Sequence, residues 1–258
     1  MNLDLNGHRA LVCGGSEGIG RATAVELAAL GARVTVMARS EDKLKNVVRA
    51  LPGDGHDHVV ADFDDTASLQ QLITGTLAPR GYTILINNAG GPPGGPVTAA
   101  TADDFLAAFR RHLVANQLLA QGLLPPMRER NFGRIVNVVS TSVYEPIPGL
   151  GVSNTVRAAV AGWAKTLSRE VASDGITVNN VLPGFTNTQR LEKLFMAKAE
   201  KTGQMPDAVA HAALEQIPAG RFAEPEETAA AIAFLASPAA AYITGVSLPV
   251  DGGRLHAI

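Results

Sequence analysis

The sequence has little that would indicate a secreted, membrane-bound or nucleic-acid-binding protein. Its 258 residues include one cysteine, Cys13, which excludes an internal disulfide and fits a reducing compartment. No apolar run approaches the roughly 18 residues that a membrane-spanning helix needs. Met1–Asn6 lacks the basic segment that opens a signal peptide. A formal net charge of −2 gives no reason to expect a nucleic acid or an anionic membrane as partner. We therefore expect a soluble, cytoplasmic protein.

A metal site is not expected either. His56 and His58 flank Asp57 and resemble a metal cluster in composition. Alternation along a strand would point both imidazoles the same way, but no third ligand follows them, and a zinc site needs at least three.

Short apolar runs with strand character alternate with helical stretches along the whole chain. We predict strands at Arg9–Cys13, Arg33–Met37, His58–Ala61, Thr83–Ile86, Arg134–Val139, Thr177–Val181 and Val246–Val250. We predict helices at Ile19–Leu30, Glu41–Ala50, Thr66–Leu77, Thr101–Arg130, Val152–Ala172 and Pro225–Ala236. Near-continuous apolar strands separated by helices are typical of a parallel sheet covered on both faces. The prediction is one doubly wound α/β domain over residues 1–258, with a parallel sheet of about seven strands.

A glycine motif follows the first predicted strand and opens the first predicted helix. It reads Gly14-Gly15-Ser16-Glu17-Gly18-Ile19-Gly20. In this setting glycine permits a tight turn and the close approach of a pyrophosphate, while the helix N-terminus supplies oriented N–H groups. The alternative is a plain glycine turn.

Further motifs follow in a fixed order, namely Asn87-Asn88-Ala89-Gly90, Pro183-Gly184, Gly220–Glu227 and Tyr242–Gly253. With the first motif they resemble the short-chain dehydrogenase/reductase family, and over most of the chain its 3-oxoacyl reductases. The resemblance implies a Rossmann-type sheet, with a nicotinamide cofactor lying across the C-terminal ends of the strands. It also implies a homotetramer or homodimer built on two long helices and the last strand.

The resemblance also assigns the residues that contact the cofactor. They are Gly14, Ser16, Gly18, Ile19, Gly20, Asp62 at the adenine, Asn88 and Gly90 near the ribose, Arg157, Pro183, Gly184, and Thr188 at the carboxamide.

The end of the second predicted strand bears on the choice of cofactor. Ala38 occupies the position where a carboxylate would select NAD, and Arg39 beside it suits a 2′-phosphate. This pair favours NADP(H) and leaves NAD(H) possible. Glu17 argues the other way, because NADP-binding relatives often carry a basic residue at that position.

The catalytic positions depart from the family pattern. The resemblance places the family's serine at Ser140, its tyrosine at Ser153 and its lysine at Arg157, and the helical asparagine corresponds to His112. Serine is a far weaker acid than tyrosine, and a guanidinium stays protonated, so it can hold an anion but cannot relay protons. The usual tyrosine-dependent reduction is therefore not supported by these residues.

Two residues offer substitutes for the missing acid. Tyr144 follows Ser140 by four residues, as in the 2,4-dienoyl-CoA reductase branch of the family, although it could equally be an aromatic residue at the rim. His112 could donate a proton because histidine titrates near neutral pH, or it could be an ordinary polar residue of a long helix.

The segment around 185–217 corresponds to the family's substrate-covering loop. A helix over Leu191–Lys201 is expected there, and its apolar residues favour a hydrophobic or acyl-like substrate: Phe185, Leu191, Leu194, Phe195 and Met196. Two hypotheses remain. The protein is an oxidoreductase that transfers a hydride between NADP(H) and a carbonyl or enoyl substrate, or it is a catalytically silent fold that serves as a nucleotide-binding sensor or subunit partner.

Overall fold

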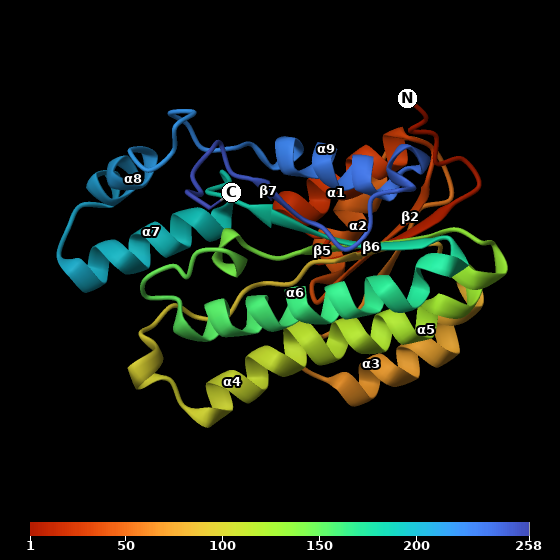
Figure 1. Cartoon of the computed structure of the whole chain (residues 1–258), viewed down its shortest axis with the longest axis horizontal. Helices are drawn as coiled ribbons and strands as arrows, with labels where there is room; N and C mark the ends of the chain where they lie inside the picture. Colours follow the sequence, from red (N-terminus) through yellow and green to blue (C-terminus); the bar gives the residue numbers. More distant parts are fainter. Residues whose placement is uncertain (258) are drawn as a thin grey trace.

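The computed structural model describes residues 1–257, which form a doubly wound α/β domain around one parallel sheet (Figure 1). Over these residues the sheet has seven strands in the order β3-β2-β1-β4-β5-β6-β7. The strands are β1 (Arg9–Cys13), β2 (Arg33–Ala38), β3 (Asp57–Val60), β4 (Ile84–Asn87), β5 (Gly133–Val138), β6 (Ile176–Pro183) and β7 (Ser247–Val250). The predicted fold is confirmed.

Helices cover both faces of the sheet, as the layers in Figure 1 show. One face carries α1 (Gly18–Ala29), α2 (Glu41–Ala50) and α9 (Pro225–Ala236). The other carries α3 (Thr66–Leu72), α4 (Ala102–Phe109), α5 (Ala115–Glu129) and α6 (Gly151–Val171). An outlying pair, α7 (Gln189–Thr202) and α8 (Pro206–Leu214), extends from one end of the sheet. Short 3₁₀ and π turns complete the set at Ile73–Leu77, Ala78–Arg80, Val97–Ala99, Arg110–Val114, Thr141–Val143, Ala172–Asp174 and Pro238–Ala240.

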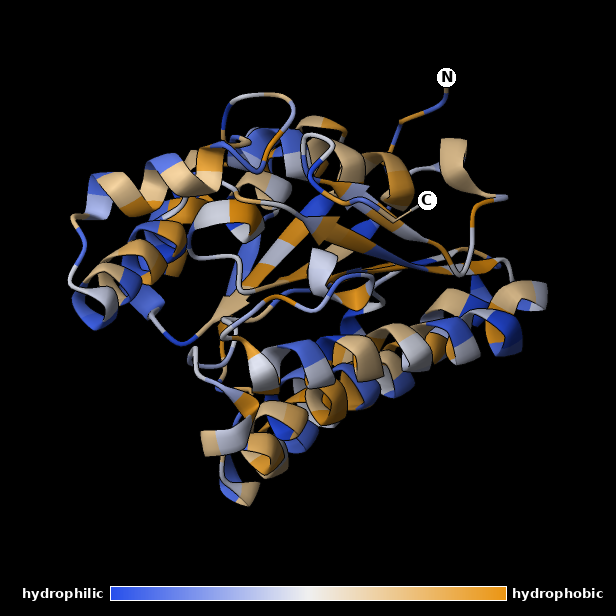
Figure 2. Ribbon diagram, turned by 60° about the vertical axis from the view of Figure 1, so that its left-hand side comes forward, coloured by the Kyte–Doolittle hydropathy of each residue, from blue (hydrophilic) through white to orange (hydrophobic). Residues whose placement is uncertain are grey.

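The strands alternate between two hydrophobic cores. Val12 packs with the α1 and α9 side, whereas Leu11 and Cys13 pack with the α5 and α6 side. Every residue of β4 and β5 is buried, which explains why these strands are mostly apolar on both faces of the sheet. Figure 2 shows the same pattern as apolar colour concentrated on the strands and on the helix sides that face them.

The strand order reverses between β1 and β4. The loops that follow these two strands therefore leave on opposite faces of the sheet and open a crevice at its carboxyl edge, where doubly wound folds bind their ligands. Within residues 1–257, no helix is both long and apolar enough to cross a membrane.

Three elements differ from the sequence prediction. The helix expected over Thr66–Leu77 consists of α3 and a π-helical turn at Ile73–Leu77. The helix expected over Thr101–Arg130 is divided into α4 and α5 by a π-helical turn at Arg110–Val114. A π-helical turn cannot be recognised from the residue types in the sequence. Such turns often occur at functional sites. The segment around 185–217 contains two helices, α7 and α8, rather than the one that was expected.

Candidate active site

A large cleft opens over the carboxyl ends of β1, β2 and β4, with a volume of about 770 Å³. It brings together most of the residues expected to contact a cofactor: Gly14, Ser16, Gly18, Ile19, Arg39, Asp62, Asn88, Gly90 and Thr188. Pro183 and Gly184 do not line it. A Cβ at Gly184 would lie 2.7 Å from the Cα of Asp251, so this glycine permits close packing of two chain segments.

The glycine loop is shaped for the close approach of a ligand. Gly14 and Gly18 have φ angles of +59° and +53°, which favour glycine. A Cβ on Gly20 would overlap the carbonyl oxygen of Gly14, and a Cβ on Gly14 would lie 2.6 Å from the backbone oxygen of Asn88. Larger residues would therefore distort the loop that forms the floor of the cleft.

The N-terminus of α1 is open toward this loop. Its N-cap residue, Glu17, makes no side-chain capping hydrogen bond. The first N–H groups of α1 have no partner within the helix, and together they favour an anion. Asn88 fixes the opposite side of the loop, because its Nδ2 donates to the carbonyl oxygens of Cys13 and Gly14 at 3.3 Å each. The cleft therefore fits the pyrophosphate of a dinucleotide.

One end of the cleft is basic. Arg39, Ser40 and Lys43 line it beside Ala38, so no carboxylate stands at the end of β2. Lys43 Nζ lies 2.7 Å from Glu17 Oε2, and both side chains are about half exposed. The charge of Glu17, which argued against NADP(H) in the sequence, is thus offset by a lysine that the sequence analysis did not identify.

The catalytic candidates do not converge on this cleft. Ser140 Oγ accepts a hydrogen bond from Ser142 N at 3.1 Å. The Tyr144 hydroxyl donates to the backbone oxygen of Ser247 in β7 at 3.0 Å, and Tyr144 is 48% exposed. Ser153 is buried in the first turn of α6. None of the three lines the large cleft.

Arg157 and His112 instead meet at a small cavity of about 10 Å³, also lined by Asn87 and Asn116. Arg157 Nη1 donates to the Val138 carbonyl oxygen at 3.0 Å. Within residues 1–257, three buried polar atoms at this cavity have no hydrogen-bond partner: Arg157 Nε, His112 Nε2 and Asn87 Oδ1. A cavity of this volume matches a single water molecule.

Burial and positive neighbours control the protonation of these two groups. Burial, followed by the charges of Arg157, Arg111 and Arg190, lowers the pKa of His112 from 6.5 to about 2. The prediction that His112 donates a proton near neutral pH therefore does not fit its environment, because the ring is neutral there. Burial, and then the charge of Arg190, lowers the pKa of Arg157 from 12.5 to about 10, so Arg157 stays charged at neutral pH.

Two arginines near this cavity were missed in the sequence. Arg111 precedes His112 and forms an ion pair with Asp64, with Nε donating to Oδ1 at 2.8 Å. Arg190 follows the α7 N-cap, Thr188, and its Nη1 donates to the Gly91 carbonyl oxygen at 3.2 Å. The only sequence feature that could have indicated Arg190 is its position two residues after Thr188, the predicted contact of the carboxamide.

The apolar residues of the substrate segment largely pack on one another. The ring centroids of Phe185 and Phe195 are 6.1 Å apart, and Phe222 lies 5.7 Å from Phe195. Leu191 is buried, Leu194 is partly buried and Met196 is exposed. The aromatic residues thus hold α7 against the loop that precedes α9.

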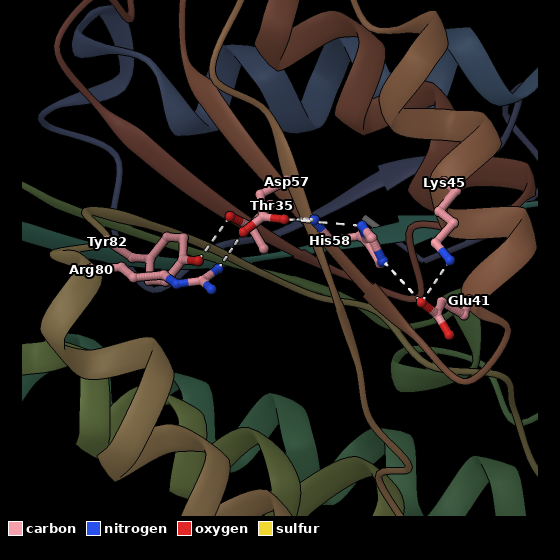
Figure 3. Close-up of polar contacts among 7 residues, drawn as sticks. All are labelled: Thr35, Glu41, Lys45, Asp57, His58, Arg80 and Tyr82. Atoms are coloured by element: carbon pink, nitrogen blue, oxygen red, sulfur yellow. Dashed lines mark hydrogen bonds and ion pairs between the residues drawn. The ribbon is translucent and has the colours of Figure 1, made fainter.

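His56, Asp57 and His58 each contact other residues of the chain. His58 Nε2 lies 3.8 Å from Glu41 Oε1, and Asp57 accepts a hydrogen bond from Arg80, as Figure 3 shows. His56 Nδ1 accepts from the backbone N–H of Val34. In the part of the chain that the structure describes, no three His, Cys, Asp or Glu residues gather as metal ligands would.

The glycine loop, the open helix terminus and the crevice at the strand reversal define a Rossmann-type dinucleotide-binding domain. A family profile described as enoyl-(acyl carrier protein) reductase matches residues 14–254. The chain belongs to the short-chain dehydrogenase/reductase family, as its motifs predicted.

Named relatives agree with this assignment. The chain is 37% identical over 254 residues to the 3-oxoacyl-[acyl-carrier-protein] reductase FabG of Vibrio cholerae, with 97% of this chain and 98% of the relative covered. It is similar to the L-sorbose reductase of Gluconobacter frateurii, solved with NADPH and L-sorbose, at 30% identity and a TM-score of 0.92 with both chains fully covered (100%). It is also similar to a 3-oxoacyl (acyl-carrier-protein) reductase of Agrobacterium tumefaciens with NADP bound, at 27% identity and a TM-score of 0.87 over 97% and 95% of the two chains.

Proposed function

We propose that this protein is an oxidoreductase that transfers a hydride between NADP(H) and a carbonyl substrate. The observation that carries the proposal is the glycine-walled cleft that opens at the α1 N-terminus and ends in Arg39 and Lys43. Reductase relatives with NADP or NADPH bound support the same cofactor. They favour a working enzyme over the catalytically silent alternative.

The residues of the cleft fit both phosphate groups of NADP(H), the pyrophosphate and the 2′-phosphate. The α1 N-terminus and the Gly14–Gly20 loop would hold the pyrophosphate, and Arg39 and Lys43 the 2′-phosphate. Asp62 would contact the adenine, Asn88 would lie near the ribose and Thr188 would contact the carboxamide, and all three line the cleft. When bound, a nicotinamide supplies or accepts the hydride.

The chain itself supplies charge stabilisation more readily than a proton. Arg157 can stabilise the oxyanion that develops when a carbonyl receives a hydride, because its guanidinium stays charged in a buried setting. Ser140 is the remaining serine of the family pattern and would donate a hydrogen bond to the same oxygen. Tyr144 becomes a proton donor only after its hydroxyl releases the Ser247 carbonyl oxygen.

Nucleotide titration tests the cofactor assignment. NADPH should bind more tightly than NADH, and Arg39→Ala should reduce that preference roughly tenfold or more through the loss of a charge-assisted contact. Arg49→Ala, a basic residue in the last turn of α2, is the matched control and should change neither affinity. Failure to bind either nucleotide would refute the proposal.

Turnover assays separate the enzyme from the silent fold. NADPH oxidation should be measured on ketones and on 3-oxoacyl and enoyl thioesters, with Ser140→Ala and Tyr144→Phe as variants. A loss of activity in Ser140→Ala with unchanged NADPH affinity is expected. The silent alternative is supported instead if the protein binds nucleotide tightly but turns over none of these substrates, and if Tyr144→Phe behaves in the same way.

The assembly, compartment and substrate class are further parts of the proposal. β7 is an edge strand with partly exposed residues, and with α5 and α6 it offers the surfaces for a homodimer or homotetramer. Light scattering after size-exclusion chromatography measures this state, and a monomer would contradict it. The buried Cys13 fits a reducing, cytoplasmic compartment, and the apolar α7 fits an acyl-like substrate.

A further inference from the structure

We propose that Arg157 and Arg190 together bind the carboxylate of the substrate, so that this enzyme acts on an oxo acid. The inference rests on the proposed hydride transfer for the reaction itself, but it concerns a separate binding contact. It gives Arg157 the substrate carboxylate as a partner in addition to the developing oxyanion, and it assigns a role to Arg190, which the family pattern does not explain.

The two guanidinium groups converge on one glycine. A Cβ built on Gly91 would lie 2.5 Å from Arg190 Nη2 and 3.3 Å from Arg157 Nη2. The residues come from different elements, Arg157 from α6 and Arg190 from the first turn of α7. Tertiary structure alone therefore brings the two like charges together.

Neither arginine has an acidic partner. Across residues 1–257, the ion pairs include none with Arg157 or Arg190. The neighbouring Arg111 is different, because Asp64 neutralises it. His112, the remaining titratable group at the cavity, is neutral. The local charge is thus positive, and Arg157 carries part of it in a buried position.

An unpaired buried guanidinium is unfavourable unless an anion meets it. Both arginines keep N–H groups that are free to donate to a ligand. Arg157 Nη1 donates to the Val138 carbonyl oxygen. Arg190 Nη1 and Nη2 donate to the carbonyl oxygens of Gly91 and Pro92 at 3.2 Å and 3.5 Å. Two guanidinium groups that lie this close together suit a planar group with two oxygens, because each oxygen can accept from a different arginine.

The position of the pair favours a substrate anion over the cofactor pyrophosphate. The pyrophosphate already has the open N-terminus of α1 and the glycine loop. Arg157 lines the small cavity behind Ala89 and does not line the large cleft. Arg190 borders both the cleft and the solvent, so an incoming ligand can reach it.

Ligand-dependent stabilisation of the protein with bound NADPH tests the site without requiring turnover. The probes are a series of 2-oxo and 3-oxo acids and their methyl esters, which keep the carbonyl and remove the charge. At least one acid should raise the melting temperature, and its ester should not. Arg190→Met should weaken acid binding roughly 10- to 100-fold, and Arg190→Lys should weaken it less. Lys193→Met, an exposed cation on the same helix, is the matched control.

NADPH titration of the same variants completes the test. Arg190→Met should bind NADPH within about twofold of the parent protein. An equal loss of NADPH and acid affinity would assign the arginine to the pyrophosphate and overturn the proposal. Stabilisation by esters as strong as by acids, or by neither, would also overturn it. If an acid binds through Arg190 and nothing turns over, the anion site stands and the proposed hydride transfer fails.

Discussion

Replacement of His112 by asparagine should remove an acid sensitivity that is built into the fold. His112 is 2% exposed, and its pKa falls from 6.5 to about 2 because of burial and then the charges of Arg157, Arg111 and Arg190. Below pH 6.5 the unfolded chain binds a proton at this residue and the folded chain does not. The neutral histidine therefore contributes stability above pH 6.5, and this contribution is lost as the pH falls toward 2.

The size of the effect follows from the gap between the two pKa values. Each pH unit inside the window reduces the free energy of unfolding by about 1.4 kcal/mol. Between pH 7 and pH 5 the loss attributable to His112 is about 2 kcal/mol. Other groups titrate in the same range, but they do so in the parent protein and the variant alike.

Equilibrium urea unfolding at pH 7 and pH 5, at one protein concentration, measures this difference. His112→Asn should lose about 2 kcal/mol less than the parent between the two pH values. His211→Asn, a change at an exposed imidazole of α8, is the control and should follow the parent. If all three proteins lose equal stability, the buried neutral histidine is not the source of the acid sensitivity.

Three further predictions follow from local contacts. Tyr82→Phe should lower the free energy of unfolding by about 1 kcal/mol in urea titrations, because the buried hydroxyl donates to Thr35 Oγ1 at 2.8 Å (Figure 3); an unchanged stability would contradict this bond. Gly20→Ala should abolish NADPH binding in fluorescence titrations while circular dichroism stays native, because the new Cβ would overlap the floor of the cleft; near-normal affinity would show that the loop adapts. Glu17→Gln should strengthen NADPH binding a few-fold at low salt, because it frees Lys43 from its ion pair. An NADPH affinity equal to that of the parent protein would mean that the Glu17–Lys43 pair is too far from the bound 2′-phosphate to affect it.

The fold was predictable from the sequence because its central strands are buried on both faces. Ile84–Asn87 is an example: all four residues are buried, and three of them are apolar, so the strand appears in the sequence as a short apolar run. The glycine loop was equally predictable, because the need for positive φ at Gly14 and Gly18 restricts these positions to glycine. Both signals are local in sequence.

The catalytic surroundings were less predictable because they depend on residues that meet only in three dimensions. His112 lies in a π-helical turn that no periodicity indicates, and its neutrality comes first from burial and then from neighbouring arginines that include Arg157 of α6. Tyr144 was singled out by its distance from Ser140 along the chain, whereas its hydroxyl binds β7. Spacing fixes which residues are neighbours in sequence, but it does not fix which way a side chain points from a loop.

The residues predicted for the catalytic positions share one property. The family resemblance places Ser153 and Arg157 where the family has a tyrosine and a lysine, and neither exchanges a proton readily near neutral pH. With a pKa of about 2 for His112 and of about 10 for Arg157, these two groups keep fixed charge states across the physiological range. At the positions predicted for a titrating pair, the chain therefore carries the constant positive charge of Arg157. A fixed positive charge stabilises an oxyanion or a carboxylate at every pH in that range, and we expect the proton of the reaction to come from Tyr144 or from solvent.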